Sequence, residues 1–108
     1  MMMSLDFSLF QDGREVFEVN ITHNLGKMAD EAGVYECLWR PDENGFTKAE
    51  DIIPLLLKGM EVLSKDKKRL QEFNPENGWG SWDSLVNFCA KVLVGCIKNP
   101  EATIEVCR

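Results

Sequence analysis

The segment 74–82 holds the side chains of this chain that are best suited to contact a ligand. It reads Asn-Pro-Glu-Asn-Gly-Trp-Gly-Ser-Trp and so combines two indoles, two carboxamides and two glycines. Pro75 has no backbone N–H and glycines permit positive φ, so the segment is predicted to be an irregular loop. An indole stacks on flat groups, and Asn74 and Asn77 can supply hydrogen bonds beside it. The loop therefore either forms one wall of a binding site or folds back as a plug over the core.

The two indoles of this segment have different expected roles. Trp82 lies in helical phase with Leu85, Cys89 and Val92, which predicts a core position in the first turn of a helix. Trp79 lies between two glycines and outside that phase. It is therefore the better candidate for stacking on a ligand, and the alternative is that it covers the core as a lid.

A second polar cluster consists of Asn20, Thr22, His23 and Asn24, where a strand is expected to lead into a helix. The free N–H groups and the positive dipole end of a helix start favour an anion or a phosphate, and His23 could change charge near neutral pH. In the alternative, Thr22 and Asn24 cap the helix and His23 bonds to a neighbouring carbonyl.

Trp39 and Arg40 end the first predicted helix, immediately before Pro41. Arg40 can bind a phosphate or carboxylate through two parallel hydrogen bonds, or stack on an indole. Alternatively it satisfies the last carbonyls of the helix, a common role for a basic residue at that position.

No catalytic, metal or cofactor motif accompanies these residues. His23 is the single histidine, no Ser or Cys partner completes a recognisable triad, and HExxH, P-loop and glycine-rich nucleotide fingerprints are absent. The four cysteines contain no CxxC pair, so we expect reduced, structural thiols. The sequence predicts a protein that is not an enzyme and needs neither cofactor nor metal.

Alternating apolar positions predict three strands, near residues 5–9, 17–21 and 103–107, the last returning to an N-terminal hairpin. A two-residue Asp12-Gly13 turn would place the two apolar sets of the hairpin on opposite faces. We therefore expect a three-residue loop, 11–13, with a left-handed Gly13, which pairs odd with odd positions.

Apolar residues at helical spacing predict about three helices between the hairpin and the last strand. The first is expected over residues 25–39 with Asn24 as its N-cap. The second should open on a capping box of Thr47 and Glu50 and be kinked or restarted at Pro54.

A short helical piece capped by Asp66 and a long helix from Ser81 to Asn99 complete the prediction. The expected order is β-β-α-α-(short α)-α-β. This is an α+β fold, a small antiparallel sheet covered on one face by about three helices, in a single domain over residues 1–108.

Charge and hydropathy exclude several classes of partner. The formal net charge is −6, whereas nucleic-acid binding needs clustered Lys and Arg, so no long nucleic acid is expected. No apolar run approaches the ~18 residues that a membrane span needs, and no secretory signal is visible. We expect a cytoplasmic protein that does not contact membranes.

Three segments resemble a family of small uncharacterised proteins that recur in phage and prophage genomes. They are Asn-Ile-Thr-His-Asn-Leu-Gly-Lys-Met-Ala at 20–29, Leu-Trp-Arg-Pro at 38–41 and Asn-Pro-Glu-Asn-Gly-Trp-Gly at 74–80, and the likeness runs from about Asn20 to Val106. The resemblance implies a phage source, and hence the cytoplasm of a bacterial host, without implying a particular chemistry.

Together these observations predict a non-catalytic small-ligand-binding protein. Its ligand-binding residues are expected to form one pocket: Asn20, Thr22, His23, Asn24, Trp39, Arg40, Asn74, Asn77 and Trp79. Such a pocket suits a small planar anion such as a nucleotide, and in a phage it could sequester a nucleotide immune signal as a counter-defence sponge. The alternative is an acidic protein–protein inhibitor or adaptor that covers a host defence protein with its indoles and Arg. Homo-oligomerisation is compatible with both.

Overall fold

The computed structural model describes residues 4–108 and contains an antiparallel sheet with strand order β2-β1-β3. β1 (Ser4–Gln11) forms a hairpin with β2 (Arg14–Thr22), and β3 (Thr103–Cys107) pairs with the other edge of β1. The predicted α+β fold and the return of the C-terminal strand are confirmed. Residues 1–3, where the segment examined for a secretory signal begins, lie outside the described residues.

The hairpin confirms the expected pairing of odd with odd positions but not the expected turn. Leu9 pairs with Phe17, whereas Gln11 pairs with Arg14, so the loop has two residues, Asp12 and Gly13, both with positive φ (54° and 77°). A register shift between Leu9 and Phe10 restores the pairing, because it inserts one extra residue into β2 as a β-bulge. The prediction of a three-residue loop was wrong because a bulge can correct the register as well as a longer turn can.

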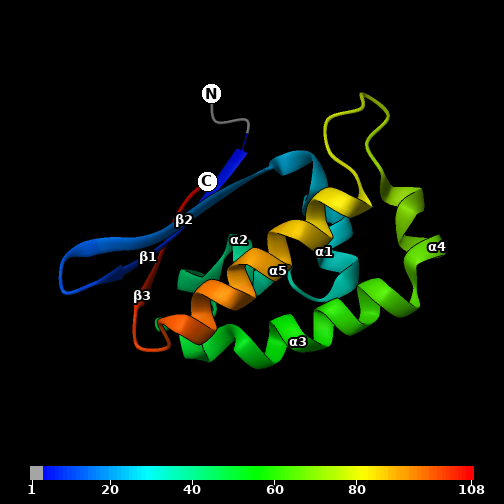
Figure 1. The fold of residues 1–108 in the computed structure, drawn as a ribbon. Helices are drawn as coiled ribbons and strands as arrows, with labels where there is room; N and C mark the ends of the chain where they lie inside the picture. The colour runs from blue at the N-terminus through cyan, green and yellow to red at the C-terminus, as the bar shows by residue number, and fades with distance from the viewer. Residues whose placement is uncertain (1–3) are drawn as a thin grey trace.

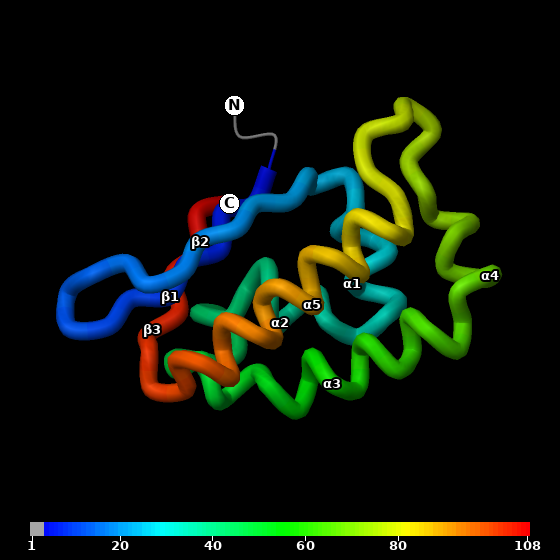
Figure 2. The backbone as a smooth tube through the Cα atoms, viewed as in Figure 1, coloured from blue at the N-terminus to red at the C-terminus, as the bar shows by residue number. Residues whose placement is uncertain are grey.

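Eight helical segments connect the hairpin to β3 within residues 4–108 (Figure 1). They are η1 (His23–Leu25), α1 (Gly26–Ala32), α2 (Tyr35–Trp39), η2 (Pro41–Glu43), α3 (Ala49–Lys65), α4 (Lys67–Leu70), η3 (Gln71–Phe73) and α5 (Trp82–Lys98). Figure 2 shows the two long helices, α3 and α5, side by side, with the tip of the hairpin extending away from them. No helix in this part of the chain is long and apolar enough to cross a membrane.

The first predicted helix is divided in two at Gly33. Gly33 has φ of 83°, and its N–H bonds to the carbonyls of Ala29 and Asp30, so it closes α1 as a left-handed C-cap. The predicted end of the helix at Trp39 is confirmed. Asn24 is not the N-cap, because Thr22 Oγ1 accepts the N–H of Asn24 at 3.2 Å and so caps η1.

The second predicted helix begins one residue later than expected. The carboxylate of Asp51 accepts the N–H groups of Thr47 at 3.0 Å and Lys48 at 2.9 Å, so Lys48 is the N-cap and Asp51 replaces Glu50 at the third position. The predicted box was therefore wrong in register. Pro54 lies within one continuous helix, so the expected restart is absent from α3.

α4 and α5 begin where the sequence predicts. Asp66 precedes α4, although its side chain makes no cap bond. Ser81 Oγ accepts the N–H of Ser84 at 3.4 Å and caps α5, which ends at Lys98.

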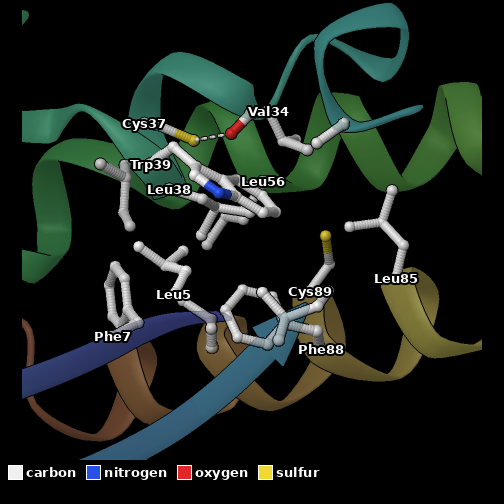
Figure 3. Packing of buried hydrophobic residues seen from close by; sticks show 14 of the residues in the cluster. Leu5, Phe7, Val34, Cys37, Leu38, Trp39, Leu56, Leu85, Phe88 and Cys89 are labelled. Atoms are coloured by element: carbon white, nitrogen blue, oxygen red, sulfur yellow. Dashed lines mark hydrogen bonds between the residues drawn. The ribbon is translucent and has the colours of Figure 1, made fainter. Parts of the chain in front are cut away.

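The core lies where β1, α2, α3 and α5 meet (Figure 3). Leu5 and Phe7 of β1 are fully buried, and Trp39 is 2% exposed with its ring centroid 6.4 Å from that of Phe88. Three of the cysteines are buried in this core and unpaired: Cys37, Cys89 and Cys96. Burial raises the pKa of each of these thiols to about 12, which makes them inert small apolar groups at neutral pH.

Candidate functional site

The predicted ligand-binding residues lie in two surface pockets rather than one. The Trp79 pocket, of about 520 Å³, is lined by Ser4, Asn20, Thr22, Asn24, Asn77 and Trp79. The Arg40 pocket, of about 320 Å³, is lined by His23, Gly26, Tyr35, Trp39, Arg40 and Arg108. Thr22 and Asn24 thus line one pocket, whereas His23 between them lines the other. Asn74 belongs to neither set of lining residues.

The loop 74–81 is shaped by its own carboxamides and glycines. Asn77 Oδ1 accepts the N–H of Trp79 at 2.9 Å, and Asn74 Oδ1 accepts the N–H of Trp82, also at 2.9 Å. Gly78 has a positive φ of 77°, which a residue with a side chain rarely adopts. Asn74 therefore connects the loop to the start of α5, and Asn77 holds the turn that presents Trp79.

Gly80 fixes this loop against the end of β2. A Cβ at Gly80 would lie 2.9 Å from Thr22 Cγ2 and 3.0 Å from Leu25 Cδ1, and its φ is 99°. Figure 1 shows the loop arching beside the end of β2 and the start of α1. Trp79 itself is 72% exposed, so it is not a plug over the core. The close contact at Gly80 holds the indole at the rim of the pocket.

Asn20, an exposed residue of the Trp79 pocket lining, has its carboxamide held by two hydrogen bonds. Its Nδ2 donates to Ser4 Oγ at 2.9 Å and to Asp6 Oδ1 at 3.2 Å. Because a carboxylate can only accept, the amide nitrogen must face Asp6, and the amide oxygen of Asn20 has no partner among residues 4–108. The side-chain amide of Asn24 is also without a partner in that range. These two groups offer donors and acceptors to a ligand.

The described residues that line the Trp79 pocket are all uncharged. Among residues 4–108 the lining contains one indole, three carboxamides and two hydroxyls, and no Lys, Arg, Asp or Glu. This arrangement can stack on a flat ring and form hydrogen bonds with its edge, but it offers no cation to a phosphate. The expected combination of aromatic face and arginine is not present in this one pocket.

Trp82 has a structural role at the junction of α3 and α5. Its Nε1 donates to the carbonyl of Leu63 at 3.1 Å, and the ammonium of Lys67 lies 4.4 Å from its ring centroid. It is half-buried and packs against the core. The predicted core position is therefore confirmed only in part.

The Arg40 pocket is built on a stack of two aromatic rings. Tyr35 and Trp39 have ring centroids 5.5 Å apart and planes 12° apart. Trp39 Nε1 donates to His23 Nδ1 at 3.0 Å, and Arg40 Nε donates to the hydroxyl of Tyr35 at 3.3 Å. His23 therefore bonds to an indole rather than to the carbonyl considered from the sequence. Since Nδ1 accepts, the ring proton of His23 lies on Nε2.

The two arginines of this pocket form ion pairs with Asp42 and Glu43, which are not among the lining residues. Arg40 Nη1 donates to Glu43 at 2.7 Å, and Arg108 donates to Asp42 at 2.8 and 3.2 Å. Bonding to the Tyr35 hydroxyl and to Glu43 raises the pKa of Arg40, and the bond from Arg108 lowers the pKa of Asp42. Arg108 also donates to the carbonyl of Trp39 at 2.9 Å. The carbonyl-satisfying role considered for Arg40 thus belongs to Arg108.

Sequence reasoning missed Tyr35 and Arg108 as residues of this pocket. Tyr35 precedes Trp39 by four positions, a spacing that places both rings on one face of a helix and could have indicated the stack. Arg108 reaches the pocket because β3 returns to β1, and no local pattern indicates this.

Comparisons with family models, with curated proteins and with solved structures each gave no match.

Proposed function

We propose that the chain is a non-catalytic protein that binds a small molecule with a flat, polar ring system, such as the base of a nucleotide, in the Trp79 pocket. The observation that carries the proposal is the indole of Trp79, which is 72% exposed at the rim of a pocket lined by carboxamides. An indole held beside carboxamides in a pocket of this size can stack on a flat ligand while the carboxamides bond to its edge.

The chemistry of the lining favours recognition of a base. Stacking of a base on an aromatic side chain contributes about 1–3 kcal/mol, and a carboxamide can pair with a donor and an acceptor on the edge of a base. The oxygen of Asn20, which has no partner among residues 4–108, and the side-chain amide of Asn24 supply such groups. A volume of about 520 Å³ is within the usual range for small-molecule sites.

The neutrality of the pocket bears on which part of a nucleotide it would contact. With no charged side chain among the lining residues in the range 4–108, affinity would come from the ring and not from a phosphate. If the chain has the phage source that its sequence resemblance implies, the ligand would be a host nucleotide signal sequestered in the host cytoplasm.

Isothermal titration with nucleosides and with linear and cyclic nucleotides tests this proposal. We expect one or more ligands to bind more tightly than high micromolar, and Trp79→Ala to weaken that binding at least about tenfold. Trp79→Phe should retain part of the affinity because it keeps an aromatic face. Ile97→Ala is the matched control, since Ile97 is 57% exposed but lies outside the pocket lining. Absence of binding across the panel would end the proposal.

The exposure of Trp79 also supports the second candidate, an acidic inhibitor or adaptor of a host protein. Indoles are common interface hot spots, and the net charge of −6 would favour a basic partner. A pull-down from host lysate distinguishes the two functions. One stoichiometric protein partner, lost with Trp79→Ala, favours the adaptor, whereas a small molecule released by heat favours the ligand-binding protein.

A further inference from the structure

We propose that the Arg40 pocket is a second, separate binding site that takes a phosphate group. The proposal does not depend on the function of the Trp79 pocket, because the two sets of lining residues do not overlap. It rests on the donors, the charges and the rigidity of the Arg40 pocket.

The lining of this pocket is rich in hydrogen-bond donors. His23 has its ring proton on Nε2, because its Nδ1 accepts the indole N–H of Trp39 at 3.0 Å. The Tyr35 hydroxyl accepts from Arg40 Nε at 3.3 Å and still has its own proton to donate. Nη2 of Arg40 has no bond to any residue in the range 4–108. A phosphate, with several strong acceptor oxygens, can satisfy these donors together.

The charges of the lining favour an anion. Arg40 and Arg108 both line the pocket, and neither Asp42 nor Glu43 does. These two carboxylates bind the guanidinium groups from positions where their side chains are 58% and 52% exposed. Exposed ion pairs of this kind are weak, so an anion in the pocket can share or displace them at little cost.

The donors are held in place before any ligand arrives. Arg40 is fixed at Nε by Tyr35, whose ring stacks on the buried Trp39, and Arg108 is fixed by the carbonyl of Trp39 at 2.9 Å. Rigid donors lose less conformational freedom on binding, which favours affinity for a small ligand. Two guanidinium groups with an imidazole and a phenol offer more donors than the two oxygens of a carboxylate can accept, so phosphate is the better fit.

Nuclear magnetic resonance titration of the whole chain with inorganic phosphate, at constant ionic strength and with chloride as reference, tests the proposal. The indole N–H of Trp39 bonds to His23 and is the natural reporter, and the Trp79→Phe and Trp82→Phe spectra assign it by elimination. We expect a saturable shift of the Trp39 signal and none of the Trp79 signal. A shift that grows linearly with phosphate, without saturation, would overturn the proposal.

Three charge variants test whether phosphate binds at Arg40. Arg40→Gln should weaken phosphate binding about tenfold, through the loss of charged hydrogen bonds. Glu43→Gln should strengthen it several-fold, since it replaces the 2.7 Å ion pair of Arg40 with a weaker neutral bond and removes a nearby negative charge. Arg69→Gln is the matched control, because Arg69 also pairs with exposed carboxylates, those of Glu31 and Asp66, elsewhere on the surface. Equal weakening by Arg69→Gln, or no gain with Glu43→Gln, would contradict a specific site.

Two further ligands identify the source of the phosphate group. Tighter binding of glycerol phosphate than of inorganic phosphate indicates a phosphomonoester, and equal or weaker binding indicates free phosphate. Acetate should bind more weakly than either. If acetate binds as tightly as phosphate and responds to Arg40→Gln in the same way, the assignment to phosphate is wrong.

Discussion

Replacing Gly59 in α3 with alanine tests how closely α3 packs on the α1–α2 turn. A Cβ on Gly59 would overlap Cγ1 of Val34, a residue that is fully buried, and would lie 3.4 Å from the carbonyl oxygen of Ala32. Gly59 therefore lets the backbone of α3 approach the turn that follows α1, and alanine would require the two to move apart.

Two opposing effects set the size of the change. Alanine is favoured over glycine within a helix by about 1 kcal/mol. Overpacking a rigid core costs about 1–3 kcal/mol, and an overlap with a buried methyl group belongs at the upper end of that range. We expect Gly59→Ala to lower the free energy of unfolding by about 2 kcal/mol, or the melting temperature by about 8 °C or more for a domain of this size.

Removing the overlapping methyl group should reverse part of this loss. Val34→Ala alone should cost about 1.5–2 kcal/mol, since it deletes two buried carbon groups. In the double variant the new Cβ at Gly59 occupies some of the vacated space, so the combined loss should fall short of the sum by at least about 1 kcal/mol. Urea unfolding of the four proteins measures this coupling. Gly26→Ala is the control, because a Cβ there meets only Tyr35 at 3.5 Å. If Gly59→Ala changes the free energy of unfolding no more than this control does, the inferred close packing of α3 on the α1–α2 turn is wrong.

Two further predictions concern stability. Trp82→Ala should lower the free energy of unfolding by about 2–3 kcal/mol, because it removes a half-buried ring and its bond to Leu63. Removing a fully buried indole would cost more. Trp79→Ala should change the free energy of unfolding by no more than about 0.5 kcal/mol. Thermal melts compare the two, and a similar loss for both would show that Trp79 supports the fold. The N–H groups of Lys48 and Thr47 lower the pKa of Asp51 from its usual value of 3.8. At a pH above this usual value the carboxylate therefore stabilises the folded state. The contribution disappears as the pH falls through the lowered pKa. Asp51→Asn should therefore weaken the acid dependence of the unfolding free energy below about pH 4, and an unchanged slope would contradict this assignment.

The strands were predictable because their apolar positions alternate over several residues, and burial of one face then requires odd positions to pair with odd positions. The means of achieving that register was not predictable. A three-residue turn and a two-residue turn with a β-bulge give the same pairing, and the residue that a bulge inserts into β2 carries no signal of its own. The break at Gly33 was likewise hidden, because the apolar spacing on its two sides is compatible with one continuous helix.

For the candidate site, sequence reasoning found side chains but could not determine which of them share a pocket. Asn20, Thr22, Asn24, Asn77 and Trp79 do line one pocket. His23 lies in the other, because consecutive residues of a tight turn point in different directions. The role of Arg40 could not be predicted without knowing which residues surround it. Arg108 is one of them, and it lies near Arg40 because β3 pairs with β1.

The central position of β1 determines when folding can be completed. Phe10 pairs with Thr103, so the sheet joins segments from opposite ends of the described chain, whereas the contacts within each helix are local. Local contacts form quickly, and distant pairings form late because a long loop must first close.

While the chain is being synthesised, β1 has its hairpin partner but lacks β3, and its second edge stays open beside Phe7. Open strand edges pair with other chains. A ribosome-bound chain that stops short of Thr103 should therefore aggregate more readily than the released protein, and holdase chaperones would act in that interval.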